Sequence, residues 1–581
     1  MSGFMKVRTI AYLCAILLIT LLCLWFLTLL TAIPPVLSHT SGFYEDDFLL
    51  TITAQAGAEI YYTLDGSVPD RNSLRYEEPL LITDSSQNPN VYSMRTDVSA
   101  GFRSDLIHRR RTHEEDSPEF KSDVLSEYTI TEDEFPQYTA PDFLVDKCTI
   151  IRAVAINRAG VASELVSASF FVGIPPEDYD GCKILSLITD PDNLFSSSKG
   201  IYVTGDTFEE YIKQDELGPY WRFWDANYRQ RGDEWERDAM FHFFDESGQL
   251  VLSKEGAIRV HGGVSRGTLP RSLNLYAREE SDRSSTFGVC LFGNDYDPQA
   301  VTLSSGGNQL ITQFNDYMMT QRVRSRNMST MLFEPYVLFL DGEYWGFYWM
   351  SEKFDGSYLS HYYGVNEDNC VIIKRHAVEV GRESDLGLYE EMVNFISDND
   401  MAVPENFSRA SELIDLDSYL DYYCTMIYIA RTDDWPGGNT ALWRSRIAAD
   451  SPYADTKWRW MLYDCNSASM RDDWELTEHD TLSDVLSVDS VFASLWNNAD
   501  FREQFYERLL EIAHECFDPE EMNRFIQEYT VEMEPILAKS WARFYGSQNS
   551  KQKEYLDTME SLRTFFLNRR GCIDSWILEG N

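Results

Sequence analysis

The chain has 581 residues, too many for a single hydrophobic core, so we expect two or three folded parts. Hydrophobic residues make up 44% of the sequence and aromatic residues 14%, which argues against general disorder. Because 94 Asp and Glu stand against 50 Lys and Arg, the formal net charge is -44. A surface this negative repels nucleic acid and anionic lipid, which argues against a nucleic-acid-binding protein. An ATP site would need its own local positive charge or magnesium.

The N-terminal segment of residues 9–33 is almost wholly apolar and carries no charged residue. It exceeds the roughly 20 apolar residues that cross a bilayer as a helix. Lys6 and Arg8 precede it and acidic residues 45–47 follow it, so the positive-inside bias places residues 1–8 in the cytoplasm and the bulk of the chain outside the cell membrane. We therefore expect an uncleaved transmembrane anchor. The alternative is a cleaved signal peptide, but the run is long for one and shows no clear A-x-A site.

Ten cysteines are present, and two of them, Cys14 and Cys23, lie in the apolar segment. The other eight are far apart and form no C-x-x-C pair, which argues against a zinc site. Disulfides and buried free thiols are both compatible with this spacing.

Residues 41–173 show the pattern of a small β-sandwich. Residues 48–70, FLLTITAQAGAEIYYTLDGSVPD, alternate as strands do, with turn signals at Asp65-Gly66 and Pro69-Asp70. Residues 149–172, TIIRAVAINRAGVASELVSASFFV, predict a strand, a turn and a second strand. The region between them, about 85–141, is polar, and we expect a long surface insertion there.

The phrases IYYTLDGSVPD and IRAVAINRAGVASE resemble the short immunoglobulin-like domain at the C-terminal end of chitobiases (β-hexosaminidases). The resemblance implies a spacer or accessory module. Exposed tyrosines of such a module could stack on a glycan, whereas core or edge packing is the favoured role for Tyr61 and Tyr62.

From about residue 180 onward, the pattern begins with strands. The runs ILSLITDPDNLF (184–195), GIYVTGDTF (200–208) and AMFHFFD (239–245) each predict a strand. Residues 257–279 predict a strand, a Gly-rich turn and another strand. The turn holds Gly262, Gly263, Ser265 and Arg266, and glycines let backbone amides approach a ligand such as phosphate. A tight turn without a ligand is the alternative.

Further strands and helices follow. Residues 304–308, SSGGN, precede an amphipathic helical stretch. Residues 335–355 predict a hairpin whose second strand carries Glu352, and NEDNCVIIKRHA predicts a strand carrying Lys374. Residues 416–430 have helical spacing, and the chain is mostly helical from residue 482 onward. Mixed strands followed by helices define an α+β domain.

The stretch of residues 431–469 carries an acid, an amide and a later acid. Asp434 lies five residues before Asn439, and Asp464 follows the largely apolar run 458–463. In phosphoryl transfer, a first acid orients the acceptor hydroxyl, while an amide and a second acid hold the metal on the phosphates. The spacing also arises by chance, and Asp and Asn are common in capped turns.

These pieces, in this order and over about residues 180–580, are similar to the CotH family, the kinase-like proteins named after spore coat protein H. The matching motifs are IRVHGGVSRGTLPRSLNLYAR, SSGGN with the helix containing Asp316, PYVLFLDGEYWGFYWMSEKFD, YYGVNEDNCVIIK, DDWPGGNTALW and KWRWMLYD. The resemblance implies an atypical protein-kinase-like fold over residues 180–581. It also implies phosphate transfer from ATP to protein Ser or Thr with a divalent metal, Mg²⁺ or Mn²⁺.

The resemblance also assigns residues. Asp434 falls on the catalytic-loop acid, with Asp433 as a rival, and Asn439 and Asp464 fall on the metal-binding amide and acid. The candidate nucleotide-binding residues are Gly262, Gly263, Ser265 and Arg266 of the Gly-rich turn, with Arg271, Glu352 and Lys374. Glu352 could pair with a phosphate-binding cation, as in kinases, or form a surface ion pair, and Lys374 has the same two alternatives. In two places the sequence departs from the family pattern. Arg271 stands where the family commonly has Lys, with which Arg is not interchangeable. Asn466 stands where a second metal-binding acid is usual, so a metal site there has one negative charge fewer.

We therefore expect a membrane-anchored extracytoplasmic kinase that acts on a surface or exported protein. An inactive kinase scaffold that binds or adheres at the cell surface is the alternative, because of Arg271 and Asn466. A polysaccharide hydrolase ranks third, since no pair of carboxylates is singled out by the sequence.

Overall fold

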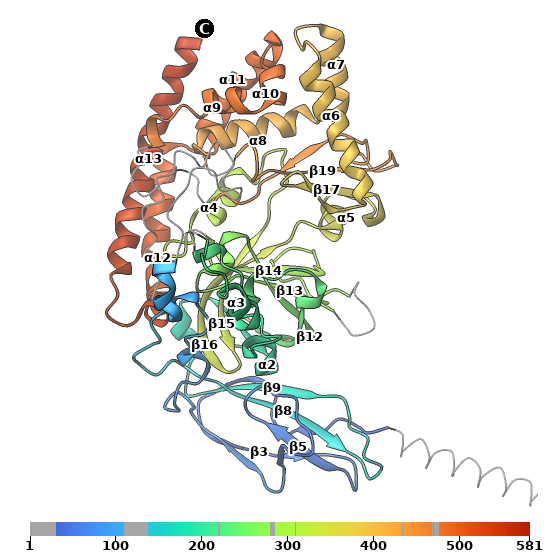
Figure 1. Cartoon of the computed structure of the whole chain (residues 1–581), viewed down its shortest axis with the longest axis vertical. Helices are drawn as coiled ribbons and strands as arrows, with labels where there is room; N and C mark the ends of the chain where they lie inside the picture. The colour runs from blue at the N-terminus through green and yellow to red at the C-terminus, as the bar shows by residue number, and fades with distance from the viewer. Residues whose placement is uncertain are drawn as a thin grey trace, which may run out of the picture.

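The computed structural model of the chain describes residues 31–109, 138–218, 221–278, 285–307, 309–432, 435–466, 469 and 476–580. A β module, a barrel and a helix-rich part follow one another along the long axis (Figure 1). Mixed strands precede helices along the chain, so the α+β prediction is confirmed. The predicted transmembrane helix, residues 9–33, lies almost wholly outside the described residues. Within the described ranges, no helix is long and apolar enough to cross a membrane.

The N-terminal module is built from short strands in three small sheets. Its strands are β1 (Val36–Leu37), β2 (Gly42–Tyr44), β3 (Phe48–Leu50), β4 (Ile52–Thr53), β5 (Glu59–Thr63), β6 (Leu74–Arg75), β7 (Leu80–Ile82), β8 (Thr149–Ile156) and β9 (Val166–Val172). The largest sheet has the order β2-β9-β8-β5-β6, and β3–β7 and β1–β4 form the others. Tyr61 and Tyr62 are both only 8% exposed, which favours packing as their role.

The polar insertion of the module is not simply a surface loop where the structure describes it. Val98 and Ala100 are buried, and the backbone N–H of Ser93 donates to the buried Glu343 carboxylate at 2.8 Å. The insertion therefore connects the module to the barrel behind it. A polar composition did not reveal this contact, because the buried acceptor lies 250 residues away.

A closed barrel forms the centre of the molecule. Its strands are β10 (Lys183–Ile188), β11 (Arg237–Phe244), β12 (Leu250–Val260), β13 (Leu273–Tyr276), β14 (Ala300–Ser304), β15 (Phe333–Leu340) and β16 (Glu343–Glu352). Their order is β10-β11-β12-β13-β14-β16-β15, and β10 closes the barrel by pairing in parallel with β15. The predicted strands of 184–195, 239–245, 257–279 and 335–355 are present.

The predicted strand at residues 200–208 is absent. The backbone N–H of Ile201 and that of Tyr202 donate to carbonyls of helix α2 (Pro191–Phe195), so no strand can use them. Helix α3 (Gly205–Tyr211) then begins at the Gly205 of this run. Ile201, Tyr202 and Val203 pack into the barrel core instead, whereas Phe208 packs in a separate cluster with Trp221 and Trp224.

A second sheet and the remaining helices form the other end. The sheet has the order β18-β17-β19-β20, with β17 (Cys370–Lys374), β18 (Ala377–Val380), β19 (Ala441–Ser445) and β20 (Arg459–Met461). The helices are α4 (Asn315–Val323), α5 (Gly356–Tyr363), α6 (Leu386–Asp398), α7 (Pro404–Leu413), α8 (Leu416–Tyr428), α9 (Thr481–Val488), α10 (Ser490–Leu495), α11 (Ala499–Glu515), α12 (Pro519–Tyr545) and α13 (Lys551–Gly580). Among them, α8 runs through the core with eleven of its thirteen residues buried.

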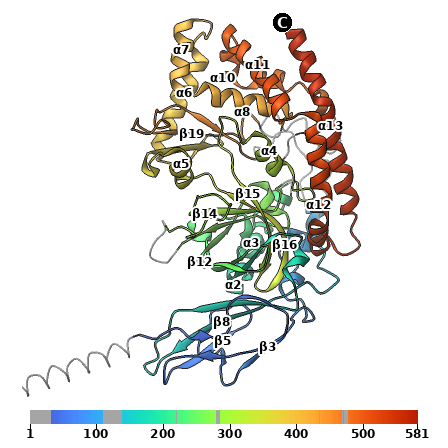
Figure 2. The ribbon, with the colours of Figure 1, turned by 180° about the vertical axis from the view of Figure 1, so that it is seen from behind.

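The last two helices form a long antiparallel hairpin along one side of the molecule (Figure 2). Helix α12 packs against β16 of the barrel, where the hydroxyl of Ser540 accepts from the N–H of Phe347 at 3.2 Å. Helix α13 packs against the helix-rich end. The hairpin thus contacts both of the parts that border the candidate site. The eight cysteines of the described residues are free thiols.

Candidate functional site

The predicted catalytic acids, Asp434 and its rival Asp433, lie outside the described residues, but the loop that follows them is fixed. Trp435 is 4% exposed and packs against Tyr422 and Tyr423 of α8. Its indole Nε1 donates to the Tyr422 hydroxyl at 3.1 Å. Burial of a large ring with its one donor satisfied holds the loop against α8.

Asn439 lies in the loop that leads from α8 to β19, against the turn between β17 and β18. Its side-chain oxygen accepts from the guanidinium Nη1 of Arg375 at 3.0 Å, and the backbone N–H of Arg375 donates to the carbonyl of Thr440 at 3.0 Å. The ring of His376 also contacts the Gly437 carbonyl. The predicted amide is therefore held directly beside the end of the strand that carries Lys374.

Asp464 follows β20 and has a left-handed backbone, with φ of 56°. Its carboxylate accepts from the amide of Asn466 at 2.8 Å. The next residue, Cys465, donates its backbone N–H to the carboxylate of Asp316 on α4 at 2.7 Å. Burial, and then the negative charge of Asp464, raise the pKa of Asp316 to about 6. Two carboxylates therefore stand close together at this point.

A small polar cavity lies next to these acids. It measures about 10 Å³ and is lined by Asp316 and Asn466 together with Ser304, Gly306, Gln309, Gln313, Asn315, Phe333 and Trp349, a volume that suits a single water. Gly307, with φ of 59°, approaches Asn466 so closely that a Cβ there would lie 2.5 Å from its amide nitrogen. The SSGGN segment thus packs directly on the segment that carries Asp464.

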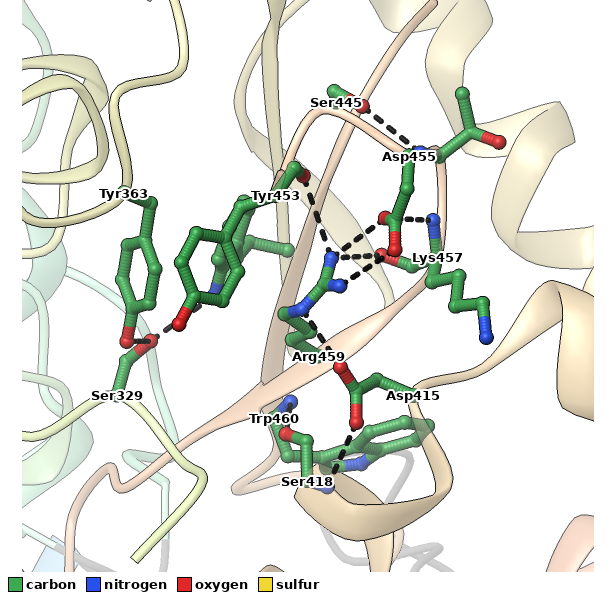
Figure 3. A network of polar contacts seen from close by, with 12 residues as sticks. Ser329, Tyr363, Asp415, Ser418, Ser445, Tyr453, Asp455, Lys457, Arg459 and Trp460 are labelled. Carbon is green, nitrogen blue, oxygen red and sulfur yellow. Dashed lines mark hydrogen bonds and ion pairs between the residues drawn. The ribbon is translucent and has the colours of Figure 1, made fainter. Parts of the chain in front are cut away.

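Strand β20, which leads to Asp464, is anchored by a network around Arg459 (Figure 3). The Arg459 guanidinium pairs with Asp455 at 2.8 Å and with Asp415 at 3.0 Å. At the end of the strand, the N–H of Leu462 donates to the carbonyl of Ser329 at 2.8 Å. Both ends of the strand are fixed, which limits the positions open to Asp464.

Cationic side chains gather at the same place. The Nζ of Lys374 lies 3.9 Å from the centre of the Tyr463 ring. Burial lowers the pKa of Lys374, Glu379 and Asp464 oppose that shift, and Arg375 and Arg231 add to it. Burial also lowers the pKa of His261 to about 3, helped by the charges of Lys374, Arg266 and Lys353. In a strongly acidic protein, these side chains form a local concentration of positive charge.

Hydrogen bonds from two arginines, Arg266 within the turn and Arg231 before it, fix the Gly-rich turn. The Gly262 carbonyl accepts from Arg266 Nε at 2.7 Å and from Arg231 at 3.2 Å, and Arg266 also donates to the carbonyl of Gln230 at 2.7 Å. Gly262 has φ of 108°, and a Cβ there would meet the Ser265 hydroxyl at 2.3 Å. Gly263 is exposed with free space around it, so this backbone is open to a ligand.

The Arg271 side chain faces Val98 of the insertion and the rings of Tyr202 and Tyr228. It is fully buried, and its guanidinium donates to the carbonyls of Arg266 at 2.7 Å and Val98 at 2.6 Å. It also lies 3.9 Å from the centre of the Tyr228 ring. These contacts favour a structural role over phosphate binding for Arg271.

Glu352 is likewise held by neutral groups. Its carboxylate accepts from the Leu332 N–H at 2.9 Å and from the Tyr362 hydroxyl at 2.5 Å, and burial raises its pKa. These contacts place Glu352 at the end of β16, where it holds strand and helix α5 together. The predicted pairing of Glu352 with a phosphate-binding cation is not among them.

Asp316 is a site residue that the sequence does not single out. It stands in a motif of the resemblance, yet nothing in the sequence brings it next to Asp464, 148 positions later. The same holds for Arg375 and His376, although a polar pair directly after the Lys374 strand could have suggested them. Both have positive φ and so form the turn that meets the Asn439 loop.

The side chains gathered here fit a divalent metal that takes part of its ligands from water and substrate phosphates. Among the residues that the structure describes, no three His, Cys, Asp or Glu side chains gather closely enough to bind a metal by themselves. Mg²⁺ characteristically takes one or two carboxylates and completes its shell with water and substrate phosphates. Asp316 and Asp464 provide two neighbouring carboxylates. Burial and then the charge of Asp464 raise the pKa of Asp316, and a cation would relieve the repulsion between the two.

Strands followed by helices, with Asn439 and Asp464 near the strand that carries Lys374, fit a kinase-like protein, and comparison with known families supports that class. The family model described as CotH kinase protein matches residues 258–573, and the model described as Fn3 associated matches residues 50–170. The first match covers more than half of the chain, so the chain belongs to the CotH kinase family, as its motifs predicted. No curated protein matches the chain. The family match begins within β12, whereas the barrel already begins at β10.

Proposed function

We propose that the protein is an extracytoplasmic, membrane-anchored kinase that transfers phosphate from ATP to Ser or Thr of a surface or exported protein. One observation carries the proposal. Lys374, Asn439 and Asp464, from three separate parts of the chain, lie around the end of β17. Asn439 accepts from the neighbour of Lys374 at 3.0 Å, and the charge of Asp464 acts on the pKa of Lys374.

The metal-binding and phosphate-binding roles would fall to different residues. Asp464, with Asp316 beside it and the amides of Asn439 and Asn466, would hold a Mg²⁺ or Mn²⁺ ion. Such an ion, when bound, supplies positive charge against the phosphates. Lys374 would bind phosphate oxygens, and the open backbone at Gly263 would approach them.

The remaining roles rest on the family pattern. Asp434, or Asp433, would accept the proton of the acceptor hydroxyl. The apolar residues 9–33 would hold the chain in the membrane with the site outside the cytoplasm, so ATP would have to reach it there. The β module would act as a spacer, with glycan as a candidate contact.

Phosphate incorporation tests the proposal. The full chain, kept in mild detergent because of its apolar N-terminus, is incubated with γ-labelled ATP, Mg²⁺ or Mn²⁺ and a mixture of exported proteins. Label should enter Ser and Thr, and Asp464→Ala should abolish it. Asp557→Ala, an exposed change on α13, should leave it unaffected. Equal incorporation by wild type and Asp464→Ala would overturn the proposal.

The second candidate is an inactive kinase scaffold that binds at the cell surface. It is favoured by the burial of Arg271 among backbone carbonyls and by Asn466 in place of an acid. Under this alternative, ATP affinity should be the same in wild type and Asp464→Ala, and the chain should bind glycan or a surface without transferring phosphate.

A further inference from the structure

Arg569, in the last helix, is fully buried and uses its guanidinium almost wholly on backbone carbonyls. Its Nε donates to the carbonyl of Tyr428 and its Nη2 to that of Ile427, both at 2.9 Å. Its Nη1 donates to the carbonyls of Thr477 and His479, both at 2.8 Å. A planar fork with five donors can serve this many acceptors, which a lysine cannot.

The acceptors belong to two segments that flank the stretch of residues 431–469 along the chain. Ile427 and Tyr428 end α8, just before the catalytic stretch begins. Thr477 and His479 follow that stretch, just before α9. All of the predicted catalytic and metal-binding residues lie between these segments in sequence. One side chain of α13 therefore holds together the two ends of the stretch.

The guanidinium adds a strong donor to carbonyls at the end of α8 and before α9, of which Ile427 also accepts from the Ala430 N–H at 3.2 Å and His479 from the Thr481 N–H at 3.1 Å. The last carbonyls of a helix have no partner within the helix, and a cation there also complements the helix dipole. The guanidinium lies 4.7 Å from the centre of the Trp576 ring, so α13 supplies both the charge and its apolar cover. Burial lowers the pKa of Arg569 to about 10, which still leaves the side chain charged at neutral pH.

A second contact joins the two ends of the same stretch directly. The carbonyl of Ile429 accepts from the backbone N–H of Ser469 at 2.8 Å and from its hydroxyl at 3.0 Å. Hydrogen bonds thus join the two ends of the stretch near Asp464, and Arg569 joins its flanking segments a second time. Of these two connections, only the one at Arg569 depends on a distant helix.

We propose that Arg569 is a positioning residue, which fixes the end of α8 against the segment 476–479 and thereby sets the catalytic stretch in its working position. Its effect on turnover rests on the proposed kinase function, whereas its effect on the two segments does not. Helix α13 is in this view a part of the site that touches neither ATP nor acceptor.

The test compares Arg569→Met and Arg569→Lys with Arg570→Met in the full chain in mild detergent. Arg570 is the matched control, because it is the neighbouring residue on the same helix and contacts His514 at the surface. Hydrogen exchange is followed in peptides covering 427–432 and 476–481, with the β15–β16 hairpin as an internal reference. Turnover and KM for ATP are measured on the same samples.

Arg569→Met should raise exchange about tenfold in both segments and leave the hairpin unchanged, because the loss of the fork opens these segments locally. Turnover should fall about tenfold while KM for ATP stays within about threefold, the result of misplacing groups that act in the transition state. Arg569→Lys should give the same pattern in weaker form, and Arg570→Met should match wild type.

If Arg569→Met does not fold, Arg569→Lys decides, since it keeps the charge and the length of the side chain. Wild-type exchange in both segments of a folded Arg569 variant would overturn the inference. Equal loosening throughout the chain would also overturn it, because it indicates a general stability role. If wild type transfers no phosphate, the proposed function fails, while the exchange data still judge the inference.

Discussion

The carboxylate of Asp316 accepts the backbone N–H of Cys465 at 2.7 Å, which places an acid from helix α4 directly beside Asp464. This contact joins helix α4, which carries Asp316, to the segment that follows strand β20. It also supplies a second carboxylate close to the position where Asn466 departs from the family pattern. The proposed metal-binding part of the site therefore carries more negative charge than Asp464 and Asn466 alone indicate.

Asp316→Asn should weaken metal binding. The amide keeps an oxygen for the Cys465 N–H but removes the charge, so we expect the apparent affinity for Mg²⁺ to fall about tenfold. Titration calorimetry with Mg²⁺ and ATP measures this. Asp557→Asn is the control, and unchanged Mg²⁺ affinity in Asp316→Asn would separate Asp316 from the metal.

Asn466→Asp should have opposite effects with and without metal. A third carboxylate beside Asp316 and Asp464 adds repulsion, so the melting temperature without metal should fall. With saturating Mg²⁺ it should recover, and Mg²⁺ should bind about tenfold more tightly. Thermal unfolding with and without Mg²⁺ provides the check. A melting temperature that responds to Mg²⁺ no more than in wild type would contradict a metal site here.

Gly307→Ala should distort the contact between the SSGGN segment and Asn466. The new Cβ would lie 2.5 Å from the Asn466 amide nitrogen at a φ of 59°, so we expect a loss of about 1–3 kcal/mol in the free energy of unfolding. Gly387→Ala, in helix α6, is the matched control, because the new Cβ would meet nothing within 4 Å. Denaturant unfolding of both variants should show loss only for Gly307→Ala.

Asp385 provides a pH-dependent test of the fold near the second sheet. Hydrogen bonds from Arg446, 2.7 Å away, hold the pKa of this buried carboxyl below its usual range. A carboxylate whose pKa is lower in the folded state adds stability that is present above its unfolded pKa and is lost as the pH falls through its folded pKa. At pH 7, Asp385→Asn should therefore cost about 2 kcal/mol.

That difference between wild type and Asp385→Asn should shrink as the pH falls below about 4, the range of the unfolded pKa. Unfolding in urea at several pH values measures it. The exposed change Asp398→Asn, at the end of helix α6 that Asp385 precedes, is the control. A difference that stays constant between pH 7 and pH 3 would rule out the pair as its cause.

Local patterns predicted the strands well where the signals were strong. The alternation of AMFHFFD gave β11, and the Asp-Gly turn at Asp341-Gly342 gave the β15–β16 hairpin, because both depend on neighbours in sequence. The helical spacing of residues 416–430 likewise gave α8. At residues 200–208 the same reasoning failed, because the backbone groups of Ile201 and Tyr202 are used by α2.

Contacts between distant parts of the chain could not be predicted. The closure of the barrel pairs β10 with β15, about 150 residues later, and no local pattern encodes that pairing. The approach of Arg375 to Asn439 follows from the pairing of β17 with β19, and Asp316 and Asp464 likewise come from distant parts of the chain. The family resemblance supplied Asp464 and Asn439, but their neighbours, and the burial of Arg271, came only from the packing.

A double-mutant cycle on ATP binding in the presence of Mg²⁺ tests most directly whether Lys374 and Asp464 belong to one nucleotide site. Calorimetry would compare wild type, Lys374→Met, Asp464→Asn and the double variant. If both side chains act on the same bound nucleotide and metal, the losses should deviate from additivity by about 1 kcal/mol or more. Losses that add within about 0.5 kcal/mol, or ATP affinity unchanged in every variant, would contradict a single site.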